Sequence, residues 1–212
     1  MNDTRVSIPF TVLTVILCAC FITDGFMEMK LTTIAGIPLT AGFLIFPITY
    51  IVNDCITELY GFRKAVFVTM LTFIVHLCVV FLLQVACWLP ATGAWEGEEH
   101  FQFIFGLAPR ITIASILGFI CGSTANAFTM DLMKRRFGGR NFKLRAFLST
   151  CVGEPVDAFV FFTIAFTGLL PFTEVMAMAC AQAVGKIVYE ACVLPVTHCV
   201  VRKIKAIEYA VV

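Results

Sequence analysis

The sequence predicts an all-α membrane protein with six transmembrane helices. Hydrophobic residues make up 60% of its 212 residues and charged residues only 14%, against about 25% in ordinary soluble domains. Six apolar segments have close to the 20 or so residues that a helix needs to cross a bilayer. Lys and Arg cluster in short connections between these segments, as they do on the cytoplasmic side of membrane proteins.

The chain is expected to begin with a helix, a turn-containing stretch and a second helix. Residues 7–23 are interpreted as a first membrane helix and not as a signal peptide, because no small-residue cleavage site follows them. Residues 27–41 lack a helical pattern and carry β-branched residues around Gly36. This favours a short outer hairpin or a re-entrant stretch before the second helix. The second helix is predicted over 41–60.

Four further apolar segments complete the six predicted helices. They cover residues 64–88, 110–132, 146–169 and 174–200. The connections between them are short, and no internal repeat or soluble segment interrupts them. We therefore expect one integral membrane domain that covers residues 1–212.

The distribution of charge predicts the orientation of the helices. Twelve of the fifteen Lys and Arg residues fall on one predicted side, six of them within 134–145. The positive-inside rule then predicts that both termini are cytoplasmic. Because this rule and contact with the lipid bilayer explain the basic clusters, we expect no direct contact with nucleic acid. The opposite, outer side is expected to carry six acidic residues: Asp24, Glu28, Glu96, Glu98, Glu99 and Glu174.

Three of the predicted helices carry paired charges. Each pair is three or four residues apart, which places both side chains on one helix face: Asp54 and Glu58, Glu154 and Asp157, and Lys186 and Glu190. A charge at the bilayer centre costs about 2.5–3.5 kcal/mol on insertion scales. These faces are therefore predicted to point away from lipid, towards protein or a wet cavity.

One lysine cannot neutralise all of these carboxylates. We expect Lys186 to pair with Asp157 or Asp54 when the protein is empty. The remaining carboxylates are then protonated, paired with Arg110, or exposed to a wet cavity. Asn126 on the fourth helix either lines this cavity or forms a hydrogen bond between helices. Such a cavity suits a cation, a ligand rich in N–H donors, or a proton. The sequence has no catalytic constellation, so we predict neither an enzyme nor a metal or cofactor site.

Three stretches are informative in combination: "FPITYIVNDCITELYGFRKA", "GEPVDAFVFFTIAFTG" and "GKIVYEACVLPVTHCVVRKIK". Together they resemble the queuosine-precursor transporter family, also called vitamin-uptake-like transporters, and the resemblance covers nearly the whole chain. It implies a single transporter domain in the bacterial inner membrane. The substrates implied are 7-cyano-7-deazaguanine, its 7-aminomethyl relative or queuine, which are used for tRNA modification.

The resemblance also implies which residues bind substrate. Asp54, Asp157 and Lys186 match acidic and basic positions of the family, and Glu58, Glu154 and Arg110 match many of its members. Ala158 and Ser123 depart from common residues of the family, which bears on substrate choice. With the paired charges and the polar residue on the fourth helix, the predicted substrate-binding set is Asp54, Glu58, Arg110, Asn126, Glu154, Asp157, Lys186 and Glu190.

Other functions are compatible with the same sequence. One alternative is the substrate-binding subunit of an energy-coupling-factor vitamin importer, which needs partner subunits. Another is a small membrane enzyme or assembly factor that uses the buried acids for chemistry. Proton-linked uptake and facilitated diffusion both fit the residues, and a homo-oligomer is compatible with them.

Overall fold

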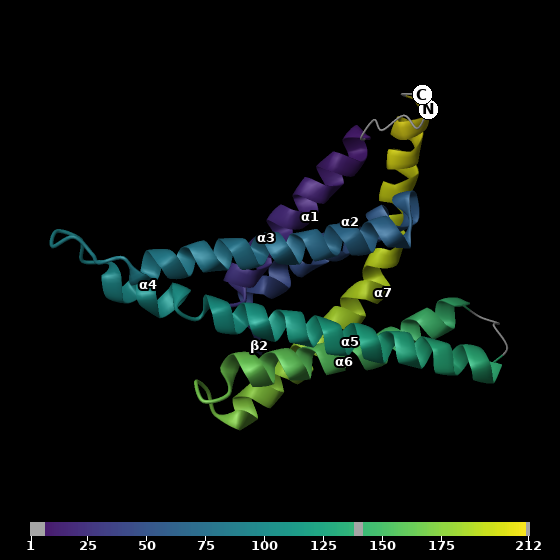
Figure 1. Cartoon of the computed structure of the whole chain (residues 1–212). Coiled ribbons are helices and arrows are strands. Elements are labelled where there is room, and N and C mark those ends of the chain that lie inside the picture. Colours follow the sequence, from purple (N-terminus) through teal and green to yellow (C-terminus); the bar gives the residue numbers. More distant parts are fainter. Residues whose placement is uncertain (1–6, 138–141, 211–212) are drawn as a thin grey trace.

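The computed structural model describes residues 7–137 and 142–210, most of which are helical. Figure 1 shows α3, α5 and α6 running lengthwise, while α1 and α7 cross them obliquely. In chain order the elements are α1 (Ile8–Met27), β1 (Leu31–Ile34), β2 (Ile37–Thr40), the 3₁₀ helix η1 (Ala41–Leu44), α2 (Phe46–Tyr60), α3 (Phe62–Trp88), α4 (Glu98–Phe105), α5 (Ala108–Phe137), α6 (Phe142–Phe166) and α7 (Phe172–Ala210).

Several helices are long and apolar enough to cross a membrane. Among the described residues five segments meet this test: Ile8–Met27, Phe62–Trp88, Glu98–Arg136, Phe147–Phe166 and Phe172–Cys192. The second predicted span, 41–60, is not among them, because Ala41–Leu44 forms a 3₁₀ turn and the α-helix begins at Phe46. The chain is thus a multi-pass helical membrane protein, and a sixth crossing is not established by helix length.

A β-hairpin occupies the non-helical stretch that precedes the second helix. Leu31 pairs with Thr40 and Ile34 with Ile37, so a two-residue turn joins the strands. Its residues Ala35 and Gly36 have φ values of 53° and 82°, and a tight turn of this kind needs positive φ at both positions. The hairpin folds back onto the helices, because Thr40 at its end is fully buried.

Two hydrophobic clusters hold the helices together. One joins α5, α6 and α7 and includes Ile111, Phe162 and Val175. The other joins α1, α2 and α3, and Val200 and Ile204 of α7 pack against it. Helix α7 therefore connects both clusters, and its middle segment lies between them. The end of α7 and the beginning of α1 lie at the same end of the molecule (Figure 1).

Glycines allow α5 and α6 to approach closely. A Cβ on Gly122 would lie 2.7 Å from the Cβ of Asp157 and 2.9 Å from the carbonyl oxygen of Gly153. A Cβ on Gly153 would lie 2.9 Å from the Cβ of Asn126. Small residues at helical spacing allow two helices to pack this closely. This close packing brings Asp157 and Asn126 to the same interface.

Candidate functional site

A buried ion pair connects α6 and α7 between the two hydrophobic clusters. Lys186 Nζ lies 2.7 Å from Asp157 Oδ2 and 3.6 Å from Glu154 Oε2. Glu154 and Asp157 are one helical turn apart, so both face the same lysine. The side chains of Lys186 and Glu154 are only 9% and 11% exposed, which keeps their charges away from lipid. Of the two partners predicted for Lys186, Asp157 and Asp54, the structure shows Asp157.

Two aromatic residues of α2 cover this ion pair. Lys186 Nζ lies 4.5 Å from the centroid of the Phe46 ring, a geometry that stabilises a cation over an aromatic face. Tyr50 donates a hydrogen bond of 2.7 Å from its hydroxyl to Glu154 Oε1. The Phe46 and Tyr50 rings lie one turn apart, with centroids 4.2 Å from each other. Helix α2 is therefore attached directly to the charged centre.

One polar cavity lies on one side of the ion pair and has a volume of about 230 Å³. It is called the basic-side cavity here because it lies towards the end of α5 that carries Lys134, Arg135 and Arg136. Thr150 in its wall donates a hydrogen bond of 3.2 Å to Glu190 Oε1. Five residues of the predicted substrate-binding set line it, so the structure brings these five together. The cavity is lined by Tyr50, Asp54, Phe119, Gly122, Ser123, Asn126, Thr150, Gly153, Glu154, Asp157 and Glu190.

A second cavity, the hairpin-side cavity, lies on the other side and has a volume of about 100 Å³. Lys186 lines it together with Asp24 of α1, Glu28 of the turn that follows α1, and Gln182 of α7. Aromatic rings from α1, α2, α5 and α6 form much of the remaining wall. The residues that line it include Phe21, Asp24, Glu28, Phe46, Tyr50, Phe119, Asp157, Phe161, Gln182 and Lys186.

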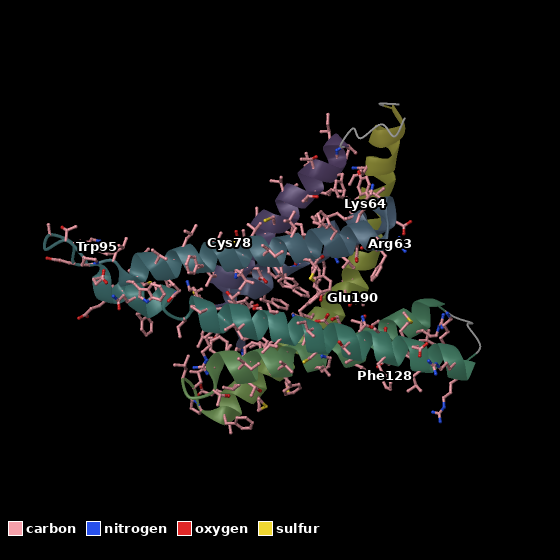
Figure 2. All side chains as sticks on the ribbon, in the orientation of Figure 1. Arg63, Lys64, Cys78, Trp95, Phe128 and Glu190 are labelled. Atoms are coloured by element: carbon pink, nitrogen blue, oxygen red, sulfur yellow. The ribbon has the colours of Figure 1, made fainter. Side chains whose placement is uncertain are left out.

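The two cavities follow one another along the helices. Along α5, Thr112 and Ser115 line the hairpin-side cavity, Gly122 and Asn126 line the basic-side cavity, and Lys134–Arg136 end the helix. Three residues, Tyr50, Phe119 and Asp157, line both cavities and so lie between them. In Figure 2 Arg63 and Lys64 lie at the opposite end of α3 from Trp95, and Glu190 lies in the middle.

The sequence predicts Asp24 and Glu28 on the outer side without giving them a role, and the structure places both against a cavity. Glu28 is 7% exposed, and both residues line the hairpin-side cavity. The hairpin is the cause, because it folds over this segment: Thr40 donates a hydrogen bond of 3.0 Å to Gln182 Oε1, and Gln182 Nε2 donates one of 3.3 Å to Glu28 Oε1. Asp24 and Glu28 are four residues apart, the same spacing that marks Asp54 and Glu58 as a pair on one helix face. This spacing is the signal that could have identified them.

These two acids retain unused acceptor atoms. Within the described ranges, Asp24 Oδ1 and Glu28 Oε2 are buried and have no hydrogen-bond partner. Burial raises the pKa of the Glu28 carboxyl, and the Thr40 hydroxyl, the charge of Lys186 and the Gln182 amide partly oppose this. Buried acceptors are nearly always paired in proteins, so unpaired ones need an explanation.

Two residues of the predicted set lie outside both cavities. Arg110 donates hydrogen bonds to the carbonyl oxygens of Ile164 and Thr167, so it connects the start of α5 to the end of α6. It therefore does not neutralise the carboxylates of the cavities. Glu58 is exposed, one turn beyond Asp54 on α2, and lines neither cavity.

Polar cavities around a charged centre, inside a multi-pass helical membrane protein, are typical of membrane transporters. Residues 40–200 match the family described as "Putative vitamin uptake transporter", and the chain belongs to this family. It is a family of transporters and not of enzymes. The chain is also 27% identical over 144 residues to the "Probable queuosine precursor transporter" of Bacillus subtilis (strain 168). That alignment covers 68% of this chain and 63% of the relative, which is less than two thirds of the relative's length. No solved structure is significantly similar.

Proposed function

We propose that this chain imports queuosine precursors across the bacterial inner membrane for tRNA modification. Its substrates would be 7-cyano-7-deazaguanine, 7-aminomethyl-7-deazaguanine or queuine. The observation that carries the proposal is the buried group of Lys186, Asp157 and Glu154 between two polar cavities, in a member of a transporter family. The printed name of the Bacillus subtilis relative supports the choice of substrate class.

The chemistry of these cavities suits a deazaguanine. The base presents a ring N–H and an exocyclic amine, which a carboxylate can accept together, and a carbonyl oxygen that Lys186 can bind. We assign binding to six residues: Asp54, Asn126, Glu154, Asp157, Lys186 and Glu190. Glu58 and Arg110 receive supporting roles, the first near the exit on α2 and the second at the junction of α5 and α6.

The ion pair also suggests how binding is linked to movement. A ligand that offers N–H donors to Asp157 competes with Lys186 for the same carboxylate. Binding would then loosen the contact of Lys186 with Asp157, which lies between the two cavities. A substrate in either cavity can in this way favour opening towards the other one.

The proposal includes an arrangement in the membrane. Residues 1–212 would form a single transporter domain that crosses the bilayer six times, with η1 and α2 supplying the crossing that helix length alone does not identify. Both termini would be cytoplasmic and the hairpin would lie on the outer side. The basic residues Lys134, Arg135 and Arg136 at the end of α5 support this orientation.

Uptake of radiolabelled precursors tests the function directly. The host cells should lack their own transporter and be unable to make the precursor, with queuosine in tRNA as the readout. We expect expression of this chain to restore uptake and tRNA queuosine with at least one of the three bases. Failure with all three, at verified membrane abundance, would contradict the proposal and direct the search to co-purifying partner subunits of an energy-coupling importer.

A further inference from the structure

The hairpin-side cavity contains acceptors that the proposed function does not use. One oxygen of Glu28 accepts from Gln182, while Glu28 Oε2 and Asp24 Oδ1 have no donor in the part of the chain that the structure describes. An unpaired buried acceptor costs about 1–3 kcal/mol. Both atoms belong to side chains that line a cavity several times larger than one water molecule needs. The cavity is therefore built to receive hydrogen-bond donors.

The two carboxyl groups are close neighbours. A Cβ placed on Gly42 would lie 2.8 Å from Asp24 Oδ1 and 2.8 Å from Glu28 Cδ. Both acids therefore pack against the same point of η1, and only a glycine leaves room for them there. Two acceptors so close to each other suit two donors that are adjacent on one ligand.

The orientation of the Gln182 amide is fixed by the hairpin. Thr40 is fully buried and donates to Gln182 Oε1, so the Nε2 group is directed to Glu28. Replacing Thr40 or Gln182 would therefore disturb the position of Glu28 without changing its carboxyl group. This arrangement holds one carboxylate oxygen in place and leaves the other available.

The remaining walls of the cavity suit a flat molecule. Phe21, Phe46, Phe119 and Phe161 line it, and Lys186 supplies a donor from α7. Aromatic faces stack on planar heterocycles, and a lysine can donate to a ring carbonyl. A cationic donor, acids and several aromatic rings occur together here, whereas the basic-side cavity has four acids and no lysine or arginine among the described residues that line it.

We propose that Asp24 and Glu28, positioned by Gln182, form a second binding station that recognises a planar heterocycle by a ring N–H and an adjacent exocyclic amine. This inference rests on the proposed function and deepens it. The ligand reaches this station at the hairpin side of the ion pair and then passes Tyr50, Phe119 and Asp157 to the basic-side cavity. The station, and not the basic-side cavity alone, determines the preference for the 2-amino group.

Competition with two bases that differ only in that amine tests the inference. Uptake of radiolabelled 7-cyano-7-deazaguanine would be measured against unlabelled 7-deazaguanine and unlabelled 7-deazahypoxanthine, which lacks the exocyclic amine. For the wild-type chain we expect 7-deazaguanine to compete about tenfold better, or more, because 7-deazahypoxanthine lacks the amine and leaves an acceptor of the cavity unpaired. Equal competition by the two bases overturns the inference and needs no variant.

Variants test which residues cause the preference for 7-deazaguanine over 7-deazahypoxanthine. Glu28→Gln keeps the shape of the side chain but exchanges an acceptor oxygen for a donor. The ratio by which 7-deazaguanine competes better than 7-deazahypoxanthine should therefore fall towards one. Asp24→Asn should reduce it as well. Glu174→Gln, an exposed position on the same helix as Gln182, is the matched control and should leave it unchanged. Membrane abundance and the thermal midpoint in detergent are measured for each.

The outcomes separate this inference from the proposed function. Wild-type uptake with an unchanged preference in both Glu28→Gln and Asp24→Asn overturns the station alone. If the Glu28→Gln protein does not accumulate in the membrane, the test of the station rests on Asp24→Asn and on the competition of the two bases for the wild-type chain. Absence of wild-type uptake for every precursor overturns the proposed function, and the station falls with it.

Discussion

The two cavities share an ion pair but differ in the chemistry of their walls. The hairpin-side cavity combines Asp24 and Glu28 with two donors, Lys186 and Gln182, and several aromatic rings. The basic-side cavity has four carboxylates and no lysine or arginine among the described residues that line it. Lys186 gives the hairpin-side cavity a cationic donor beside its acids, whereas four carboxylates without such a cation favour cationic or hydrated groups. The difference suggests recognition on one side and passage on the other.

The largest effect is expected from Lys186→Met, because it removes the cation that both cavities depend on. Breaking a buried ion pair by removing one partner costs about 3–5 kcal/mol. We expect uptake to be lost and the amount of folded protein in the membrane to fall. Uptake assays and size-exclusion profiles in detergent measure the two effects.

A second change separates charge balance from binding. Adding Asp157→Asn to Lys186→Met removes a carboxylate along with its cation, so part of the lost abundance should return while uptake stays absent. Lys203→Met, an exposed position further along α7, is the control. Full uptake by Lys186→Met would show that the ion pair is dispensable and that the two cavities work independently.

Asp54→Asn tests the basic-side cavity alone. Asp54 lines this cavity, whereas Glu58 one turn further on α2 lines neither. We expect Asp54→Asn to abolish uptake at normal abundance, because the amide places a donor where the substrate needs an acceptor. Glu58→Gln is the matched control on the same helix and should retain most of the uptake. Equal effects of the two changes would argue against a special role for this cavity.

The contrast between the cavities also marks what the sequence could predict. The basic-side acids and Lys186 were predicted, because a charge inside an apolar helix is conspicuous and helical spacing says which charges share a face. Asp24 and Glu28 were not, because they follow an apolar run and resemble loop residues. What buries them is the contact of Thr40 with Gln182, 142 residues apart along the chain, and local patterns carry no information on such contacts.

Arg110 and the second predicted span also depend on tertiary contacts that the local sequence does not reveal. An arginine near the start of a predicted helix can equally neutralise a cavity acid or satisfy carbonyl groups, and only the packing of α5 against α6 decides between these. The apolar run at 41–60 predicted a helix, but the hairpin requires a 3₁₀ turn at Ala41–Leu44 before α2 begins. Hydropathy predicted the membrane class and most helices, while tertiary contacts determined which polar groups meet.

Gly122→Ala should disturb the helix contact that supports the basic-side cavity. The new Cβ would lie 2.9 Å from the carbonyl oxygen of Gly153 and 2.7 Å from the Cβ of Asp157, and backbone atoms cannot move aside cheaply. Overpacking of this kind costs about 1–3 kcal/mol. The thermal midpoint in detergent should fall, whereas Gly93→Ala, which meets no atom within 4 Å, should leave it unchanged. An unchanged midpoint in both variants would mean that α5 and α6 can separate freely.

The smallest effect is expected from Tyr50→Phe, which acts at the layer between the cavities. The change removes the hydrogen bond of 2.7 Å to Glu154 and keeps the ring against Phe46. One such bond contributes about 0.5–1.5 kcal/mol net, so a change of about twofold to tenfold is expected. Because Tyr50 attaches α2 to the charged centre, we expect the maximal uptake rate to change more than the apparent KM. Tyr189→Phe, which lines neither cavity, is the control. A raised KM at constant rate would instead make Tyr50 a ligand contact, and the two cavities would then be parts of one binding site.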